Sequence, residues 1–304
     1  MDKLLVICGP TATGKTALAL ALARKFNGEL VSADSRQVYK GMDIGTGKDR
    51  DKDIPIWMYD VVRPDEEFSV GHYQKLARQI VADIISRRKL PIVVGGTGLY
   101  IQSLTKAIDT AGIPPNTELR NQLLKLTKEQ LQEKLQTVSR NVWIHLNTSD
   151  RNNPRRLIRK IEIAGSQYCA HEEFPRYDVL TIGLTDVNGI LYSRVDKRVD
   201  QRVKQGIVQE ISGLLRQGYT WNLPAMSASG YKEWKPLFDA QKNETGQNDS
   251  TLIDSVVQKW KFDEHGYVRR QLTWFKKQSG IRWFTITDPG YQSDVTAEVR
   301  AWYT

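Results

Sequence analysis

One segment constrains the fold of this chain more than any other: Gly9-Pro10-Thr11-Ala12-Thr13-Gly14-Lys15-Thr16. It fits the pattern G-x-x-x-x-G-K-[ST], and it lies between an apolar run at residues 4–8 and an Ala/Leu-rich stretch at residues 15–26. A glycine turn between a strand and a helix presents its backbone N–H groups to a phosphate, while the lysine and the hydroxyl suit phosphate oxygens and Mg²⁺. The pattern therefore predicts a strand, a phosphate-binding loop and a helix, and the alternative is a glycine turn that only starts a helix. The expected phosphate ligands are Gly9, Thr11, Ala12, Thr13, Gly14, Lys15 and Thr16, of which Thr16 is also expected to hold the metal.

Short apolar runs alternate with helical periodicity through the first third of the chain. Residues 29–33 and 90–94 are predicted to be buried strands. Between them, apolar residues recur at helical spacing from an N-cap candidate, Ser69, to about Arg88. This alternation is typical of a parallel sheet, whose ligands collect at the carboxyl ends of its strands. We therefore predict an α/β fold in which helices flank a parallel sheet of the P-loop NTPase type.

The character of the sequence changes to mainly helical from about residue 114. Thr127 and Gln130 have the spacing of a capping box, and helices are predicted over 155–164, 191–217 and 268–278. The polar stretch 240–250 is expected to be an exposed loop. We divide the chain into a core with the phosphate loop (1–110), a mainly helical insertion (111–190) and a return to the core with C-terminal helices (191–304).

Charge and cysteine usage limit the classes of protein to which the chain can belong. The 304 residues include 44 Lys and Arg against 35 Asp and Glu, and residues 151–160 hold five basic side chains and no acidic one. That window indicates either a polyanionic partner or an ordinary solvated surface. No apolar run approaches the roughly 18–20 residues of a membrane span, and Cys8 and Cys169 cannot build a disulfide framework or a four-ligand zinc site. We therefore expect a cytoplasmic protein without a membrane partner.

Two polar residues follow predicted strands and are expected near the phosphate loop. Asp34 follows the strand at 29–33, and Thr97 follows the strand at 90–94 through Gly95 and Gly96. An acid, a hydroxyl and a phosphate cradle together suit activation of a nucleophile while a phosphate group is held. For both residues the alternative is a cap of the segment that follows.

The chain resembles the tRNA dimethylallyltransferase (isopentenyltransferase) family over most of its length. The segments that carry the resemblance are Gly9–Thr16, Asp34-Ser35-Arg36-Gln37-Val38-Tyr39-Lys40-Gly41-Met42-Asp43-Ile44-Gly45-Thr46, Gly95-Gly96-Thr97-Gly98-Leu99-Tyr100, Asn153-Pro154-Arg155-Arg156-Leu157, Gly230-Tyr231 and Arg270-Gln271-Leu272-Thr273-Trp274. The resemblance implies transfer of a dimethylallyl group from dimethylallyl diphosphate to the exocyclic N6 amine of the adenosine 3′ to the anticodon in tRNA. It also implies that the helical insertion binds tRNA, and we expect a monomer that engages the anticodon stem-loop.

The resemblance also suggests roles for individual residues. Asp34 is expected to be the general base, Thr97 to orient the diphosphate or the amine, and Arg194 to meet the charge of the leaving diphosphate, which Mg²⁺ also neutralises. Arg198, one helical turn from Arg194, is expected to bind the donor; the alternative is that both arginines are solvated partners of Asp196 and Asp200. The residues expected to contact tRNA are Ser35, Gln37, Arg155, Arg156, Arg159, Arg269 and Arg270. Gln37 has a plain surface role as its alternative, and Trp274 and Phe275 are expected to pack in the core.

The chain departs from the family pattern at Gly47-Lys48-Asp49, Pro55-Ile56-Trp57, Ser227, Lys232 and Glu264-His265-Gly266. The departures at Gly47–Asp49 and Ser227 fall near segments expected to contact substrate, so they bear on the choice of tRNA or on rate more than on reaction type. The closest alternative is an adenylate isopentenyltransferase acting on free AMP, ADP or ATP, which has no need for the basic window. A small-molecule kinase with a phosphate loop and a non-enzymatic nucleic-acid-binding protein are more distant alternatives.

Overall fold

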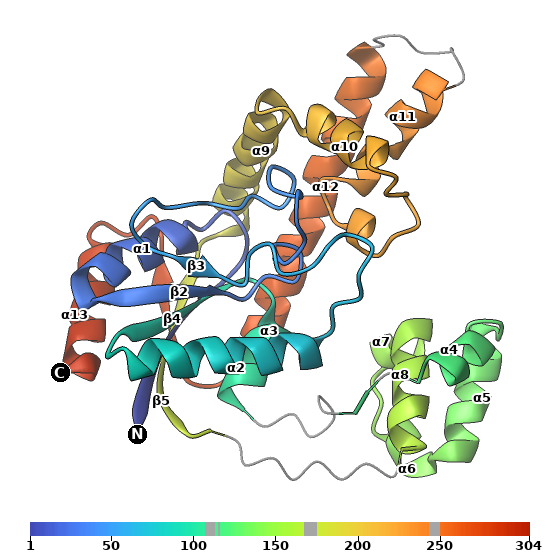
Figure 1. Cartoon of the computed structure of the whole chain (residues 1–304), viewed down its shortest axis with the longest axis horizontal. Helices are drawn as coiled ribbons and strands as arrows, with labels where there is room; N and C mark the ends of the chain where they lie inside the picture. The colour runs from blue at the N-terminus through green and yellow to red at the C-terminus, as the bar shows by residue number, and fades with distance from the viewer. Residues whose placement is uncertain (107–112, 115, 167–174, 243–249) are drawn as a thin grey trace. The chain divides into compact units, whose positions relative to one another are not determined.

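A computed structural model describes residues 1–106, 113–114, 116–166, 175–242 and 250–304. The chain forms two compact units, Met1–Thr105 with Pro175–Thr304, and Lys106–Phe174 (Figure 1). The second unit overlaps the range 111–190 that the sequence assigns to a helical insertion, but it begins at Lys106 and ends at Phe174. Among the described residues, no helix combines the length and apolar character that a membrane crossing requires.

The first unit contains the sheet and most of the helices. Its elements are β1 (Asp2–Cys8), α1 (Lys15–Phe26), β2 (Gly28–Ser32), β3 (Ile56–Trp57), α2 (Val70–Ser86), β4 (Leu90–Gly95), α3 (Gly98–Thr105), β5 (Tyr177–Thr185), α9 (Asn188–Lys204), α10 (Ile207–Arg216), η1 (Ala225–Ser227), η2 (Lys232–Trp234), α11 (Lys235–Lys242), α12 (Ser250–Phe275), β6 (Ile281–Thr285) and α13 (Tyr291–Tyr303).

The six strands form one sheet in the order β3-β2-β4-β1-β5-β6, and every neighbouring pair is parallel. Side chains alternate between the two faces of a strand, so each face of β1 contributes to a different apolar cluster. Leu5 and Ile7 pack with α1 and α13, whereas Leu4 and Val6 pack with α2 and α3. The predicted fold class, a parallel sheet flanked by helices, is confirmed.

A third apolar cluster joins α9, α10, α11 and α12 to residues 38–42. Trp234 and Trp260 are fully buried in it, with their rings edge to face at 6.3 Å between centroids. Phe275 at the end of α12 is buried in the sheet's own core and the partly buried Trp274 packs beside it, so the expected core role of these two residues is confirmed. The cluster that contains Trp234 and Trp260 fixes α9 and α12 against the segment that follows β2. Polar side chains collect at that segment.

The second unit is a small helical bundle with its own core. It consists of α4 (Thr117–Leu123), α5 (Lys128–Val138), α6 (Arg140–Ile144), α7 (Thr148–Arg151) and α8 (Pro154–Ala164). Leu123, Leu135 and Leu157 meet in its apolar cluster. The Thr127–Gln130 capping box predicted from spacing is present at the start of α5.

Three elements differ from the prediction. The helix predicted over 191–217 is two helices, because Gly206 has a left-handed φ of 98° at the N-cap of α10 and interrupts the first helix. Helix α12 starts at Ser250, so it is much longer than the predicted 268–278. Of the predicted loop 240–250, Ala240 belongs to α11 and Ser250 to α12, and residues 243–249 lie outside the described residues. Cys169 also lies outside them, whereas Cys8 is buried in β1 and burial raises the pKa of its thiol to about 12.

The periodicity does not predict β3, β5 or β6. Strand β5 lies inside the range expected to be helical and pairs with β1 over seven residues, from Asp2↔Tyr177 to Cys8↔Gly183. Strands β3 and β6 form the two edges of the sheet. An edge strand such as β6 mixes Arg282 with apolar residues, so it lacks the continuous apolar run that marks the buried strands β1 and β4.

Candidate functional site

The predicted phosphate-binding loop lies at the carboxyl end of β1, as expected, and helix α1 begins at Lys15. Gly9, Ala12 and Gly14 all have positive φ values, of 135°, 64° and 84°. A side chain at Gly9 would place its Cβ 2.2 Å from the carbonyl oxygen of Leu184, so the close approach of the loop to β5 requires glycine there. The loop is therefore held in a conformation that a glycine-poor turn could not adopt.

Lys15 folds back over the loop. Its Nζ donates to the carbonyl oxygen of Pro10 at 2.6 Å, and the Thr13 hydroxyl donates to the same oxygen at 2.9 Å. Burial, followed by the charge of Arg198, lowers the pKa of the Lys15 ammonium to about 8. A bound anion would relieve both effects, so the lysine is suited to receive one.

Two arginines of α9 reach the phosphate loop. Arg194 Nε donates to the carbonyl oxygen of Ala12 at 2.7 Å. Arg198 donates to the Thr11 hydroxyl at 3.3 Å and to the carbonyl oxygen of Gly47 at 3.4 Å. The alternative considered from sequence is that both arginines are solvated partners of Asp196 and Asp200. Instead, Asp196 pairs with His265 and Asp200 pairs with Lys261.

Asp34 and Thr97 follow the adjacent strands β2 and β4, so the parallel sheet brings them together as predicted. The Thr97 N–H donates to the carbonyl oxygen of Ala33 at 3.0 Å, and the Thr97 hydroxyl accepts from the Ser35 N–H at 3.0 Å. The Asp34 carboxylate accepts from the Arg36 N–H at 2.8 Å. Asp34 does cap the turn that follows it, but its carboxylate also lines the cavities described next.

Two adjoining cavities share four lining residues, Thr11, Asp34, Thr46 and Tyr267. The first, which we call the donor cavity, has an empty volume of about 480 Å³ and is also lined by Lys15, Thr16, Gln37, Tyr59, Val94 and Arg198. The second, the acceptor cavity, has an empty volume of about 870 Å³ and is also lined by Ser35, Arg36, Arg202, Ser227, Lys232, Glu264 and Arg270. Four basic side chains face two acidic ones in the acceptor cavity, so it favours an anionic ligand.

Helix α12 contributes two site residues that the sequence reasoning did not single out. Gln271 accepts from the Thr11 N–H at 2.9 Å and donates to the carbonyl oxygen of Gly96 at 3.0 Å, so one amide joins the phosphate loop to the end of β4. Tyr267, one turn earlier, forms a side-chain hydrogen bond with Thr97, and burial raises the pKa of its hydroxyl. Arg270 lies over the Tyr267 ring, with its guanidinium carbon 5.7 Å from the centroid. Two sequence signals could have found these residues: Gln271 belongs to the segment Arg270–Trp274 that carries the family resemblance, and Tyr267 lies one helical turn before Gln271 on the same face.

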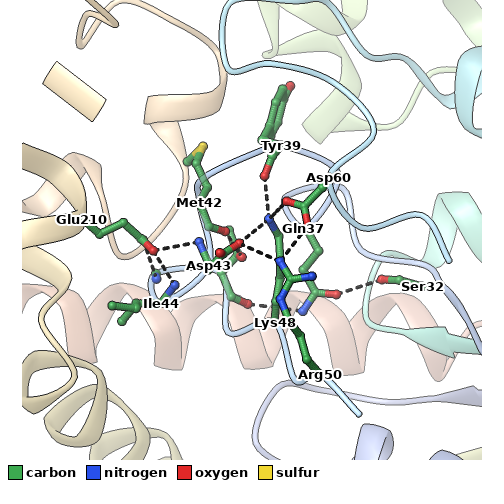
Figure 2. Close-up of polar contacts among 12 residues, drawn as sticks. Ser32, Gln37, Tyr39, Met42, Asp43, Ile44, Lys48, Arg50, Asp60 and Glu210 are labelled. Carbon is green, nitrogen blue, oxygen red and sulfur yellow. Dashed lines mark hydrogen bonds and ion pairs between the residues drawn. The ribbon is translucent and has the colours of Figure 1, made fainter. Parts of the chain in front are cut away.

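Gln37 is not a surface residue. Its side-chain oxygen accepts from the Ser32 hydroxyl at 2.8 Å, and its amide nitrogen donates to the carbonyl oxygens of Gly47 at 3.1 Å and Thr46 at 3.4 Å (Figure 2). It is only 9% exposed. The plain surface interpretation is therefore wrong, and the amide braces the segment that contains Thr46.

The basic residues expected to contact tRNA fall in both units. Arg155, Arg156 and Arg159 lie on α8 in the second unit, where Arg156 pairs with Asp150 at 2.5 Å and Arg159 with Glu162 at 3.3 Å. Arg269 and Arg270 are exposed on α12 in the first unit, and Arg270 lines the acceptor cavity. Three departures from the family pattern, Ser227, Lys232 and Glu264, line the same cavity.

Comparison with known proteins places this geometry in a family. A family model described as IPP transferase matches residues 37–278, and one described as isopentenyl transferase matches residues 2–56. The chain is 40% identical to a tRNA dimethylallyltransferase of Roseiflexus castenholzii over 99% of this chain and 97% of that protein. It is 37% identical to a tRNA dimethylallyltransferase of Geobacillus thermodenitrificans over 95% of this chain and 92% of that protein.

Solved structures agree with these sequence comparisons. The crystal structure of a tRNA isopentenylpyrophosphate transferase from Bacillus halodurans has a TM-score of 0.72 at 31% identity, covering 99% of this chain and 97% of its own. A eukaryotic dimethylallyltransferase acting on tRNA has a TM-score of 0.80 at 28% identity, covering 99% of this chain and 78% of its own. The similarity thus extends over nearly the whole of this chain.

Proposed function

The chain belongs to the IPP transferase family, and from this premise we propose that it transfers a dimethylallyl group from dimethylallyl diphosphate to the exocyclic N6 amine of the adenosine 3′ to the anticodon in tRNA. The observation that carries the proposal is the position of Asp34, which lines both the donor cavity beside Lys15 and the acceptor cavity beside Arg36. A carboxylate at that junction is within reach of both partners of a group transfer.

In the proposed reaction Asp34 accepts the hydrogen bond of the N6 amine and then its proton. The amine nitrogen forms a bond to the allylic carbon, and the carbon–oxygen bond to the diphosphate breaks with its electron pair leaving on oxygen. An exocyclic aromatic amine is a weak nucleophile because its lone pair is delocalised into the ring, so a positioned base accelerates the step. Thr97 fixes the Asp34 turn through Ser35 and orients the amine or the diphosphate.

The departing diphosphate needs positive charge and hydrogen-bond donors. We assign this role to the loop from Gly9 to Thr16, which includes Lys15, and to Arg194 and Arg198. Lys15 and Arg198 line the donor cavity, and Arg194 donates to the loop at the Ala12 carbonyl. The Thr16 hydroxyl lines that cavity and is a hard oxygen donor of the kind that Mg²⁺ prefers. Mg²⁺ bound there with the diphosphate would neutralise the charge that develops on the leaving oxygens.

The target base must leave the anticodon stack to reach such a site, which costs a few kcal/mol. Contacts with the backbone of the anticodon stem-loop would compensate for this cost. We assign these contacts to Arg155, Arg156 and Arg159 of the second unit and to Arg269 and Arg270 of α12. Ser35 and Gln37 are assigned to the base, with Gln37 acting through the segment that it braces. We further propose that the protein works as a monomer in the cytoplasm, which sedimentation at micromolar concentration and cell fractionation would test.

The proposal is tested with radiolabelled dimethylallyl diphosphate, Mg²⁺ and either unmodified tRNA or AMP. We expect label to enter tRNA and the signal to be lost with Asp34→Ala. Label that enters only AMP would assign the chain to the free-nucleotide enzymes, and no label in either acceptor would count against dimethylallyl transfer altogether.

A further inference from the structure

Residues 43–48, which we call the junction loop, form part of the wall between the two cavities. Gly45 lines the acceptor cavity, and Thr46 lines both cavities. The loop follows the turn after β2 and contains no regular secondary structure. Its position at the junction must therefore be fixed by contacts from elsewhere in the first unit.

Glu210 of α10 supplies one set of those contacts (Figure 2). Its Oε2 accepts from the backbone N–H groups of Asp43 at 2.9 Å and Ile44 at 2.7 Å, and its Oε1 accepts from the Gly45 N–H at 3.1 Å. The Tyr231 hydroxyl also donates to Oε1, at 2.6 Å. One carboxylate thus holds three consecutive peptide groups of a segment that lies 165 to 167 residues away in sequence.

The carbonyl groups of the junction loop hold the arginines of the site. Gly45 accepts from Arg202 at 3.0 Å, and Gly47 accepts from Arg198 at 3.4 Å and from Gln37 at 3.1 Å. The Asp43 carbonyl shares its planar peptide with the Ile44 N–H held by Glu210, and it accepts at 3.0 Å from the Lys48 N–H, whose own planar peptide carries the Gly47 carbonyl. Glu210 is therefore connected, through the loop, to the Arg198 guanidinium in the donor cavity.

Lys48 anchors the far end of the loop. Its side chain is fully buried and donates to Asp43 at 2.7 Å, to Asp60 at 2.6 Å and to the carbonyl oxygen of Tyr39 at 2.7 Å. Arg50 pairs with Asp60 at 2.7 Å beside it (Figure 2). Lys48 thus fixes the end of the junction loop, and Glu210 fixes its start.

We propose that Glu210 is a positioning residue for the transfer reaction: it holds the junction loop so that Thr46 lies at the meeting point of the cavities and Gly47 orients Arg198 toward the donor. The kinetic consequences of this inference rest on the proposed function. The hydrogen bonds from which it is argued are independent of that function. The competing explanation is that Glu210 only contributes to the stability of the α10 region.

Two variants separate these explanations. Glu210→Gln keeps the shape of the side chain but replaces one acceptor oxygen with an NH₂ group, which cannot accept from a loop N–H. Tyr231→Phe is the matched control, because it removes the fourth hydrogen bond to the same carboxylate and leaves the three loop bonds in place. Glu210→Asp, which keeps both oxygens on a shorter side chain, takes the place of Glu210→Gln if that variant does not fold.

The kinetic test varies dimethylallyl diphosphate and tRNA separately. Each variant and the parent chain are assayed at the same number of degrees below their own unfolding midpoints. For Glu210→Gln we expect kcat to fall about tenfold or more and KM for dimethylallyl diphosphate to rise, with the Kd for tRNA within about twofold, since small displacements of site groups cost rate steeply. For Tyr231→Phe we expect kcat within about twofold. Equal losses in both variants, or a folded Glu210→Gln with parental kinetics, would overturn the proposal.

Hydrogen exchange followed by mass spectrometry gives a readout that needs no activity. Glu210→Gln should accelerate exchange in peptides covering residues 42–48 about tenfold or more, because one or two of the three loop N–H groups lose their acceptor, while peptides from β1 stay unchanged. If the parent chain shows no transferase activity but this exchange pattern appears, the proposed function fails and the positioning of the loop by Glu210 stands. If exchange in residues 42–48 is unchanged, Glu210 does not hold the loop.

Discussion

The backbone N–H of Ser35 donates a 3.0 Å hydrogen bond to the hydroxyl oxygen of Thr97. Ser35 immediately follows Asp34, and Thr97 follows the neighbouring strand β4, so this bond links the ends of two strands at the junction of the cavities. It acts with the Arg36 N–H bond to Asp34 to fix the direction of the carboxylate. A hydroxyl at position 97 therefore affects Asp34, the proposed base, even where it touches no substrate.

Thr97→Val should lower kcat about tenfold without a comparable loss of stability. Valine has the same shape but no acceptor, so the Ser35 N–H loses its partner and the Asp34 turn gains freedom. Thr97→Ser keeps the oxygen and should stay within about threefold of the parent chain. Steady-state kinetics at saturating tRNA measures kcat, and thermal unfolding measures stability. A parental kcat in Thr97→Val would show that the hydrogen bond between the two strand ends does not contribute to the rate.

The convergence of Asp34, Thr97 and the phosphate loop could be predicted because it follows from local rules. Three apolar runs mark β1, β2 and β4, and the carboxyl ends of parallel strands lie at one edge of a sheet. The contributions of Gln271 and Glu210 could not be predicted in this way. Each lies on a helix whose pattern shows only that the position is polar, and its partner is set by packing between segments more than 160 residues apart.

Lys48 illustrates a different limit of sequence reasoning. It stands in a strongly charged segment, residues 48–53, which local rules predict to be an exposed loop. Its side chain is nevertheless fully buried, because Asp43, Asp60 and the Tyr39 carbonyl surround the ammonium group. A buried charge of this kind depends on the tertiary positions of its partners.

Glu29 provides a prediction about acid stability. The carboxylate at the start of β2 is almost fully buried and accepts hydrogen bonds from Arg87, from Lys89 at 2.7 Å and from the Trp57 indole at 2.8 Å. The Arg87 hydrogen bonds, with those of Lys89 and Trp57, lower the pKa of Glu29 to about 2 in spite of its burial. The folded state therefore binds fewer protons than the unfolded state between the two pKa values, and the free energy of unfolding falls as the pH drops from about 4.5 toward 2.

From this shift, Glu29 contributes about 3 kcal/mol to the free energy of unfolding at pH 7 and about half of that at pH 3. Glu29→Gln should be less stable than the parent chain at pH 7, and the difference between the two should shrink by about 1–2 kcal/mol at pH 3. Urea unfolding at the two pH values measures both differences. A difference that does not change with pH would mean that the carboxylate titrates normally in the folded state.

Lys15 provides a prediction about the pH dependence of donor binding. The pKa of its ammonium in the free protein is lowered to about 8, first by burial and then by Arg198. The ammonium is therefore charged below pH 8 and loses its proton as the pH rises further, which removes its attraction for a diphosphate. Inorganic pyrophosphate with Mg²⁺ is a suitable probe, measured by calorimetry between pH 7 and 9.5.

The comparison uses Lys15→Met, which keeps the length of the side chain but carries no charge at any pH. The ratio of the two affinities cancels the titration of pyrophosphate itself. At pH 7 we expect the parent chain to bind pyrophosphate about tenfold or more tightly than Lys15→Met does. Above pH 8 we expect this ratio of affinities to fall about tenfold per pH unit. An advantage that persists unchanged to pH 9.5 would contradict the lowered pKa.

Arg155 and Arg159 of α8 lie one helical turn apart and are expected to behave differently toward tRNA. Arg159 is engaged within its own unit, where it pairs with Glu162 at 3.3 Å and donates to the carbonyl oxygen of Ile113 at 2.7 Å. Arg155 is exposed, and no ion pair involves it among the residues that the structure describes. A free guanidinium on a basic helix can bind a phosphate and release its counterion, so each such contact adds about one to the salt dependence of binding.

Arg155→Ala should therefore weaken tRNA binding about three- to tenfold near 0.1 M salt and lower the slope of log K against log salt by about one, without changing the thermal unfolding of the chain. Arg159→Ala removes the same formal charge but leaves Glu162 with fewer partners, so its main effect should be loss of stability in the second unit. Fluorescence anisotropy with an anticodon stem-loop at several salt concentrations measures the slopes. If Arg155→Ala keeps the parental slope while Arg159→Ala lowers it, the phosphate contact belongs to Arg159, and its pairing with Glu162 must open when tRNA binds.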